Sequence, residues 1–281
     1  MRSWKVRLSI TTLVGLTLLS LTPAPAPPAP SASPAASAAE PWIHDPYTSN
    51  WNLASYPSGP SNENLLGTDD RGRDILARLI YGLRYSLFFA GLTLALSFSL
   101  GAFLGFIAGF FGGVADLLLS RLVEIVENLP ALLLLMLFAS LVEPRLWRLA
   151  LLLACLDWSF SFHQVRVSVQ RLKRQDFVLS SVVLGASPFH IFHQHILPHT
   201  LTPLSTQAPL AFAKYISSLT FLDFLGLGLP PPTPSWGEML YQAQRNWHAE
   251  WLFWGPTLAL ATLLLCLFTV SNELMRDFRV R

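Results

Sequence analysis

The run YSLFFAGLTLALSFSLGAFLGFIAGFF, residues 85–111, decides the fold class of this chain. It contains no charged residue and is longer than the roughly 20 residues that a helix needs to cross a bilayer. A second run, WLFWGPTLALATLLLCLFTVSN at residues 251–272, shares both properties. We therefore interpret both runs as membrane helices.

The composition agrees with a membrane protein. Of the 281 residues, 52% are hydrophobic and only 13% are charged, whereas soluble domains carry roughly 25% charged residues. The 19 Lys and Arg against 17 Asp and Glu are too evenly balanced for a nucleic-acid-binding surface. The two cysteines, Cys155 and Cys266, stand alone in apolar runs, so we expect neither a disulfide framework nor a cysteine metal site.

Three further apolar runs, at 117–142, 146–165 and 201–229, are interrupted by charged residues. Charges inside a membrane span are costly, so these helices should face protein or water. The candidates for a gate or a solute pathway are Glu124, Glu127, Asp157, Lys214 and Asp223.

Helical geometry limits how these charges can pair. Lys214 and Asp223 are separated by about 13 Å along a helix and lie on opposite faces, so they cannot pair with each other. We favour a pair between Lys214 and Asp157 of the preceding span, with a wet pathway and an interfacial lysine as the alternatives. Glu124 can pair with Arg121, and Pro130 should kink that span. These glutamates belong either to an inner gate or to an ion pair at the membrane surface.

The first apolar run, residues 8–21, follows three basic residues and precedes a segment rich in Pro, Ala and Ser. The pattern fits a signal peptide or an uncleaved helix, and we favour the helix. The expected organisation is an N-terminal membrane helix at 1–22, an external linker at 23–64 and a transmembrane domain at 65–281. More basic residues flank one set of helix ends than the other, which predicts six crossings with both termini in the cytoplasm.

The segment 164–200 lies between two spans on the predicted cytoplasmic side. Residues 176–184 can form a short helix, and Gly185 suits a left-handed C-terminal position. Ser187 and Pro188 form an N-cap and first-turn pair, and Pro198 should end the second short helix. Two short helices on the membrane surface form a docking device or a plain amphipathic connector.

Three other patterns carry weaker predictions. Gly101, Gly105 and Gly109 repeat every four residues, which favours a close helix contact, although glycine is common in membrane helices. The four histidines between 190 and 199 do not place three side chains on one helical face, so we expect no metal site. The outer segments 230–236 and 247–254 are rich in Pro and Trp, which indicates an aromatic belt or a surface for a binding protein.

The segment VLSSVVLGASPFHIFHQHILPH, residues 178–199, resembles the EAA loop of binding-protein-dependent ABC importer permeases. The family pattern places three residues and a glycine after Glu-Ala-Ala and continues to His-Ile-Leu-Pro. In that family the loop docks on a cytoplasmic ATPase. The resemblance assigns this role to Ser180, Ser181, Val182, Val183, Leu184, Gly185, Ala186 and Ser187.

The chain departs from the family at the Glu-Ala-Ala positions. These fall on Leu179, Ser180 and Ser181, so the acidic residue is absent. Asp176 lies three positions earlier, about one helical turn away, and can supply a negative charge to the same partner.

Two more segments resemble the dipeptide, oligopeptide and nickel group of these permeases. LLGTDDRGRDILARLIYGLRYSL, residues 65–87, is similar to the L-G-T-D-x-x-G-R-D run before the second span. FLGLGLPPPTPSWGEML, residues 224–240, is similar to the outer loop after the fifth span. The resemblance covers roughly residues 65–279.

This resemblance implies an all-α integral membrane protein with about six transmembrane helices and the type I ABC importer permease architecture. It implies a multi-pass permease of the bacterial inner membrane that carries peptides or similar small solutes. The partners it implies are a second permease subunit, two ATPase subunits and an external solute-binding protein.

ATP hydrolysis is expected on another chain. A Walker A loop needs a lysine directly after glycine, and Lys5, Lys173 and Lys214, the three lysines of the sequence, do not follow glycine. We therefore expect no catalytic residue and no cofactor on this chain, with ATP and Mg²⁺ bound by partner ATPases. The competing hypotheses are a self-sufficient proton-coupled transporter that uses Asp157, Lys214 and Asp223 as a relay and a membrane-bound enzyme, for which no catalytic motif is present.

Overall fold

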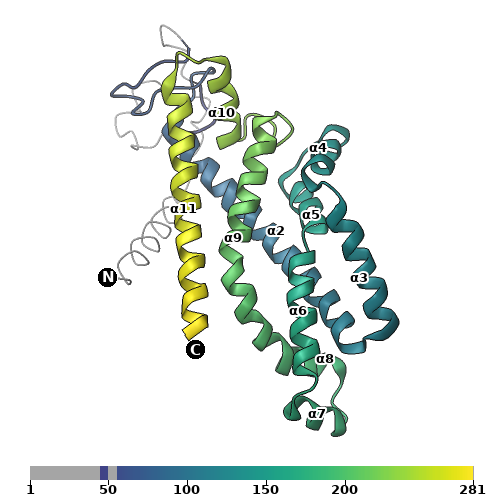
Figure 1. Ribbon diagram of the computed structural model, residues 1–281. Helices are drawn as coiled ribbons and strands as arrows, with labels where there is room; N and C mark the ends of the chain where they lie inside the picture. The colour runs from purple at the N-terminus through teal and green to yellow at the C-terminus, as the bar shows by residue number, and fades with distance from the viewer. Residues whose placement is uncertain (1–44, 50–55, 281) are drawn as a thin grey trace, which may run out of the picture. The chain divides into compact units, whose positions relative to one another are not determined.

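The structure, a computed structural model, describes residues 45–49 and 56–280 (Figure 1). Within these residues the regular structure is helical, apart from one isolated β-bridge between Thr68 and Asp74. The helices are α2 (Ile75–Phe111), α3 (Gly113–Asn128), α4 (Ala131–Leu141), α5 (Leu146–Leu156), α6 (Ser159–Leu172), α7 (Asp176–Val183), α8 (Pro188–Ile191), the π-helix η2 (Phe192–Ile196), α9 (Leu197–Phe224), α10 (Trp236–Arg245) and α11 (Glu250–Val280). The predicted first membrane helix and most of the linker lie outside the described residues.

In the described part of the chain, two helices are individually long and apolar enough to cross a membrane. They are α2 and the Glu250–Arg276 part of α11, and they contain the two charge-free runs of the sequence. The pair α3 and α4 meets the same criteria as one bent span. The fourth and fifth predicted spans correspond to α5 with α6 and to α9.

The chain divides into two compact units, which are described separately. Among the described residues, the first unit contains those up to Phe89 and Ile216–Val270, and the second contains Ala90–Tyr215 and those from Ser271. The long helices α2, α9 and α11 each contribute residues to both units.

In the second unit, α2 packs closely on α6 through its three spaced glycines. A Cβ atom added to Gly101 would lie 1.9 Å from Ser161 Oγ, and one added to Gly105 would lie 2.5 Å from the carbonyl oxygen of Phe162. At Gly109 it would lie 2.8 Å from the carbonyl oxygen of Arg166. The predicted close helix contact is therefore confirmed, since any larger residue would overlap with α6.

The third predicted span is broken at Pro130, where α3 and α4 meet at 75°. Leu129 has extended backbone angles, φ −81° and ψ 133°. A proline disfavours the helical conformation of the residue before it and cannot donate a backbone hydrogen bond. The predicted kink is confirmed, and it is a complete break.

The fourth predicted span is also broken. Helix α5 ends at Leu156 and α6 begins at Ser159, with Asp157 at φ −121° and ψ 22° between them. Residues 146–165 form one interrupted apolar run in the sequence, and the structure divides this run at Asp157. At the break, Ser97 Oγ donates to the carbonyl oxygen of Asp157 at 2.8 Å. Ser161 Oγ donates at 3.0 Å to the carbonyl oxygen of Trp158, which also accepts from the Phe162 N–H.

In the first unit, two tryptophans, one from α10 and one from α11, hold α2 and the segment before it. Trp236 Nε1 donates to the carbonyl oxygen of Leu79 at 2.9 Å, and Trp251 Nε1 donates to that of Thr68 at 3.2 Å. A Cβ atom on Gly82 would lie 2.9 Å from the Trp236 ring, so the glycine makes room for the indole. Both tryptophan rings therefore serve packing within this unit.

Candidate functional site

The predicted docking loop forms two short helices with a tight turn between them. Helix α7 begins at Asp176, as predicted, and ends at Val183, and Gly185 has φ +80°. The Ala186 N–H donates to the carbonyl oxygen of Ser181 at 3.0 Å, the bond that closes a helix after a left-handed residue. Glycine adopts this conformation without the steric cost of a side chain.

The second short helix begins as predicted but ends differently. The Ser187 side chain caps it by accepting a 3.2 Å hydrogen bond from the His190 N–H, with Pro188 in the first turn. Pro198 does not end the helical segment, because the chain continues through η2 and Pro198 is the second residue of α9. The expectation for Pro198 was wrong because the π-helical turn η2, in which the Leu197 N–H donates to the carbonyl oxygen of Phe192, lies directly before the proline. Such local changes of the hydrogen-bond pattern allow a membrane helix to pass a proline.

One face of the docking loop is anchored in the core of the second unit. Val178, Ile191 and Ile196 are buried together with Leu204 of α9. The same cluster contains two residues of α2, Ala102 and Phe106, and two of α6, Val165 and Val169. A displacement of α7 or α8 would therefore act directly on α2, α6 and α9.

The opposite face of the loop exposes large apolar side chains. Val183 and Leu184 are 86% and 85% exposed, and Phe189 is 72% exposed. Ser180 and Ser181 donate their hydroxyl groups to the carbonyl oxygens of Asp176 and Phe177 at 2.7 and 2.9 Å. The face that the loop presents is thus mainly apolar, which is typical of a binding surface.

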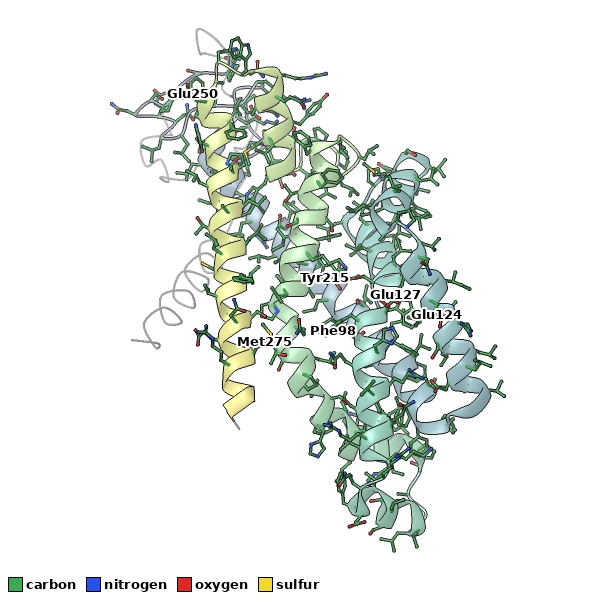
Figure 2. The ribbon with its side chains drawn as sticks, viewed as in Figure 1. Phe98, Glu124, Glu127, Tyr215, Glu250 and Met275 are labelled. Carbon is green, nitrogen blue, oxygen red and sulfur yellow. The ribbon has the colours of Figure 1, made fainter. Side chains whose placement is uncertain are left out.

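Asp157 of the predicted fourth span and Lys214 of the predicted fifth span meet in the second unit. Lys214 Nζ contacts Asp157 Oδ1, so the predicted pair is present. Asp157 lies at the break between α5 and α6, and the Lys214 side chain is 58% exposed against 19% for Asp157. Next to the pair, Tyr215 donates to Ser97 Oγ at 3.3 Å. Figure 2 labels Tyr215 and Phe98 in this region.

Glu124 and Glu127, also labelled in Figure 2, have partners nearby on the surface of the second unit. Glu124 pairs with Arg121 at 2.6 Å, as predicted for a spacing of three residues. Glu127 lies 3.2 Å from His163 Nε2 of α6. Both glutamates are about half exposed, and their part in a gate remains a prediction.

Asp223 belongs to the first unit and is buried. Its carboxylate accepts hydrogen bonds from the Ser235 hydroxyl and, at 2.7 Å, from the Leu229 N–H. A Cβ atom added to Gly228 would overlap with this carboxylate, so the glycine leaves the room that the Asp223 side chain occupies. The geometry gives Asp223 a direct role in shaping the loop between α9 and α10.

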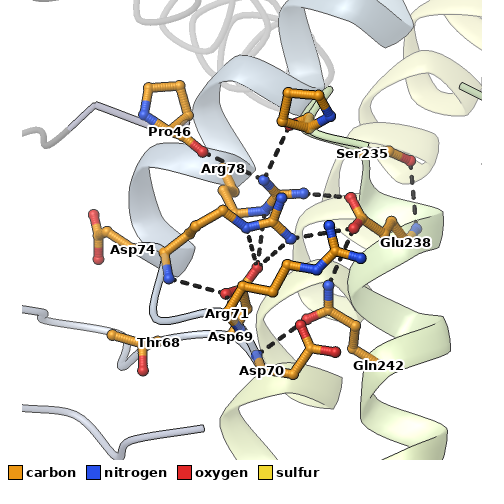
Figure 3. Close-up of polar contacts among 12 residues, drawn as sticks. Pro46, Thr68, Asp69, Asp70, Arg71, Asp74, Arg78, Ser235, Glu238 and Gln242 are labelled. Atoms are coloured by element: carbon orange, nitrogen blue, oxygen red, sulfur yellow. Dashed lines mark hydrogen bonds and ion pairs between the residues drawn. The ribbon is translucent and has the colours of Figure 1, made fainter. Parts of the chain in front are cut away.

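A buried ionic network in the first unit was not foreseen from the sequence (Figure 3). Arg73 contacts Asp69 at 2.6 Å and Glu238 at 3.1 Å, and Arg78 contacts the same two carboxylates. Gln242 Nε2 donates to Glu238 at 3.2 Å. The charged residues come from the two outer motifs quoted above, so the motifs were visible in the sequence but their contact was not.

Two tryptophans of the outer segments line an apolar cavity of about 760 Å³ in the first unit. Trp247 and Trp254 share it with Phe221, Phe224 and Phe253. The choice between an aromatic belt and a protein-binding surface stays a prediction. Among the described residues, no group of three or more His, Cys, Asp or Glu could hold a metal ion.

Comparison with known proteins places these features in a family. Residues 101–279 match the family described as binding-protein-dependent transport system inner membrane component. The chain is 38% identical over 222 residues to the inner membrane ABC transporter permease protein YejE of Escherichia coli strain K12, covering 79% of this chain and 65% of the relative. It is 36% identical over 214 residues to the dipeptide transport system permease protein DppC of Haemophilus influenzae, covering 76% and 72%.

A third relative is the peptidoglycan transport system permease protein YejE of Agrobacterium fabrum, 35% identical over 252 residues, with 86% of this chain and 65% of the relative covered. The chain thus spans about 65% of the length of the two YejE relatives. A structure of the MetNI methionine ABC transporter matches with a TM-score of 0.55 at 16% identity, covering 72% of this chain and 97% of the matched chain.

The structural match supports the all-helical type I importer fold, and the family match includes the docking loop and the Asp157–Lys214 pair. The chain belongs to the family of binding-protein-dependent transport system inner membrane components.

Proposed function

We propose that this chain is a permease subunit of an ATP-driven importer for peptides or similar small solutes in the bacterial inner membrane. A second permease subunit completes the pathway, two ATPase subunits supply energy, and an external solute-binding protein delivers the solute. ATP and Mg²⁺ bind on the ATPases, and both termini of this chain lie in the cytoplasm. The name of the dipeptide transport system relative supports the solute class.

The observation that carries this proposal is the two-sided docking loop. Its inner face, at Val178 and Ile191, is buried against α2, α6 and α9. Its outer face exposes Val183, Leu184 and Phe189. A partner that covers the outer face can therefore move the membrane helices through the inner face.

The mechanism follows from this coupling. Closure of the ATPases upon nucleotide binding displaces α7 and α8, and the shared core passes this displacement to α2, α6 and α9. These helices rock between arrangements that open the pathway alternately to the two sides of the membrane. The loop binds the open and the closed ATPases with different free energies. This difference shifts the equilibrium between the two arrangements of the membrane helices.

The proposal is tested by measuring whether uptake depends on ATP or on the proton gradient. Uptake of labelled alanine tripeptide is measured in cells that express the chain with its neighbouring transport subunits, after ATP depletion by arsenate or after collapse of the proton gradient by a protonophore. We expect uptake to stop with arsenate and to survive the protonophore while ATP is maintained. The reverse pattern would favour the self-sufficient proton-coupled transporter.

A further inference from the structure

The broken fourth span places a charged pair beside a small cavity. Non-helical backbone within a membrane protein is tolerated where it is buried in protein or lines a water-filled cavity. At this break, Ser97 and Ser161 bond to the carbonyl oxygens of Asp157 and Trp158. Ser161 Oγ also lies 3.1 Å from the carbonyl oxygen of Ser97. The break is therefore held in one position by hydrogen bonds to α2 and within α6.

The cavity has a volume of about 210 Å³. Its lining includes both members of the ion pair, Asp157 and Lys214, and the aromatic side chains of Phe98, Phe160 and Tyr215. Gln207 contributes an amide to the same wall. Whole small-molecule sites usually enclose about 300–1,000 Å³, so this cavity suits one end of a peptide rather than a whole one.

The two charges are not equally accessible. The Lys214 side chain is 58% exposed, whereas that of Asp157 is 19% exposed. The Lys214 side chain as a whole is therefore more accessible to a solute than the Asp157 side chain, and both line the cavity. A negatively charged group is the complementary partner for this cation.

We propose that Lys214 binds the terminal carboxylate of the transported solute, which replaces Asp157 as its partner during passage. This inference rests on the proposed function and names the solute end that the permease contacts. Exchange of one carboxylate for another keeps the Lys214 ammonium group paired throughout, while the Asp157 carboxylate loses its cation and stays beside the cavity. Asp157 stays close and repels the bound carboxylate, which keeps the contact weak enough for release.

The test compares uptake of alanine tripeptide with uptake of the same tripeptide carrying a C-terminal amide, in cells that contain all transport subunits. The solute-binding protein is identical in every strain, so a change in the ratio of the two uptake rates between variants belongs to the permease. Uptake is normalised to the amount of the chain in the membrane. We expect the double variant Asp157→Asn with Lys214→Gln to lower the acid-to-amide ratio by roughly tenfold, about the value of one charge-assisted hydrogen bond.

Two further variants sharpen the test. Gln207→Glu places a competing carboxylate in the cavity wall while leaving the ion pair in place, and we expect it to lower the ratio as well. Lys214→Arg keeps the charge and should keep the preference for the acid. The Glu273–Arg276 pair of α11 has nearly the same exposure, 20% and 58%, so its neutralisation by Glu273→Gln with Arg276→Gln is the matched control and should leave the ratio unchanged.

The outcomes separate this inference from the proposed function. An unchanged ratio in Gln207→Glu, or in the neutralised Asp157–Lys214 variant with uptake retained, would overturn the role of Lys214 while leaving the importer intact. If the wild-type chain with its partners takes up neither tripeptide, the proposed peptide import itself fails.

Discussion

Arg78 contacts the carboxylate of Glu238, 160 positions further along the chain, and its guanidinium is fully buried. Arg73 contacts the same glutamate, and both arginines share Asp69. Two positive and two negative charges thus compensate each other within the first unit. This network joins the segment before α2 to α10 (Figure 3).

Removal of one carboxylate should therefore be strongly destabilising. Glu238→Gln leaves two buried arginines with one carboxylate, and the loss of one partner of a buried ion pair costs about 3–5 kcal/mol. The free energy of unfolding is measured in mixed detergent micelles. Glu143→Gln, which removes an exposed ion pair with Arg145, is the control and should cost less than about 1 kcal/mol. Equal effects of the two substitutions would contradict a structural role for the network.

The glycine contact between α2 and α6 leads to a second prediction. Gly101→Ala places a Cβ atom against the backbone of Trp158 and the side chain of Ser161, and we expect a loss of about 1–3 kcal/mol from overpacking. Gly91 is the matched control, because its added Cβ would lie 3.8 Å from the Phe212 ring. Gly91→Ala should be neutral or stabilising by up to about 1 kcal/mol, since alanine favours a helix. Thermal unfolding in detergent ranks the two variants, and a tolerated Gly101→Ala would show that the helices are not in close contact.

Asp223 should stabilise the loop between α9 and α10. Asp223→Ala leaves the Leu229 N–H and the Ser235 hydroxyl without their acceptor, at a cost of about 2 kcal/mol. Asp223→Asn retains one oxygen that can accept from Leu229, so it should cost less. Limited proteolysis of the segment 225–235 measures the loop directly. If both variants are cleaved as slowly as the wild type, the carboxylate does not hold the loop.

The left-handed Gly185 gives a prediction for coupling. Gly185→Val forces a branched side chain into positive φ, which costs roughly 1–2 kcal/mol and should displace α7 from α8. Asparagine tolerates this conformation, so Gly185→Asn is the conservative variant. We expect uptake to fall in the valine variant and to be largely retained in the asparagine variant, at equal amounts of chain in the membrane. Equal uptake by the two would show that the turn conformation is unimportant.

The elements governed by local signals were predictable from the sequence. The charge-free runs located α2 and α11, because length and composition alone decide a membrane helix. Asp176 marked the first turn of α7 by its negative charge, and Gly185 marked the end of α7 by its tolerance of a left-handed backbone conformation. Gly101, Gly105 and Gly109 indicated the face that packs on α6, because small side chains permit close approach.

Features that depend on tertiary contacts could not be predicted. The break at Asp157 depends on Ser97, a residue of another helix, which bonds to the freed carbonyl oxygen. Pro198 indicated a helix end, yet the helical segment runs through it, with the π-helical turn η2 directly before the proline. The contact of Arg78 with Glu238 joins two motifs far apart in the chain, and sequence spacing carries no information about such a pair.

The most direct test of the coupling claim is co-purification of the tagged chain in mild detergent, with mass spectrometry of the bound proteins. Leu184→Glu puts a charge on the exposed face of the docking loop, and Leu65→Glu does the same at another exposed leucine, in the first unit. We predict that the wild type and Leu65→Glu bind an ATPase and a second permease, and that Leu184→Glu retains the second permease but loses the ATPase. Full retention of the ATPase by Leu184→Glu, or purification of the wild-type chain alone, would contradict the account.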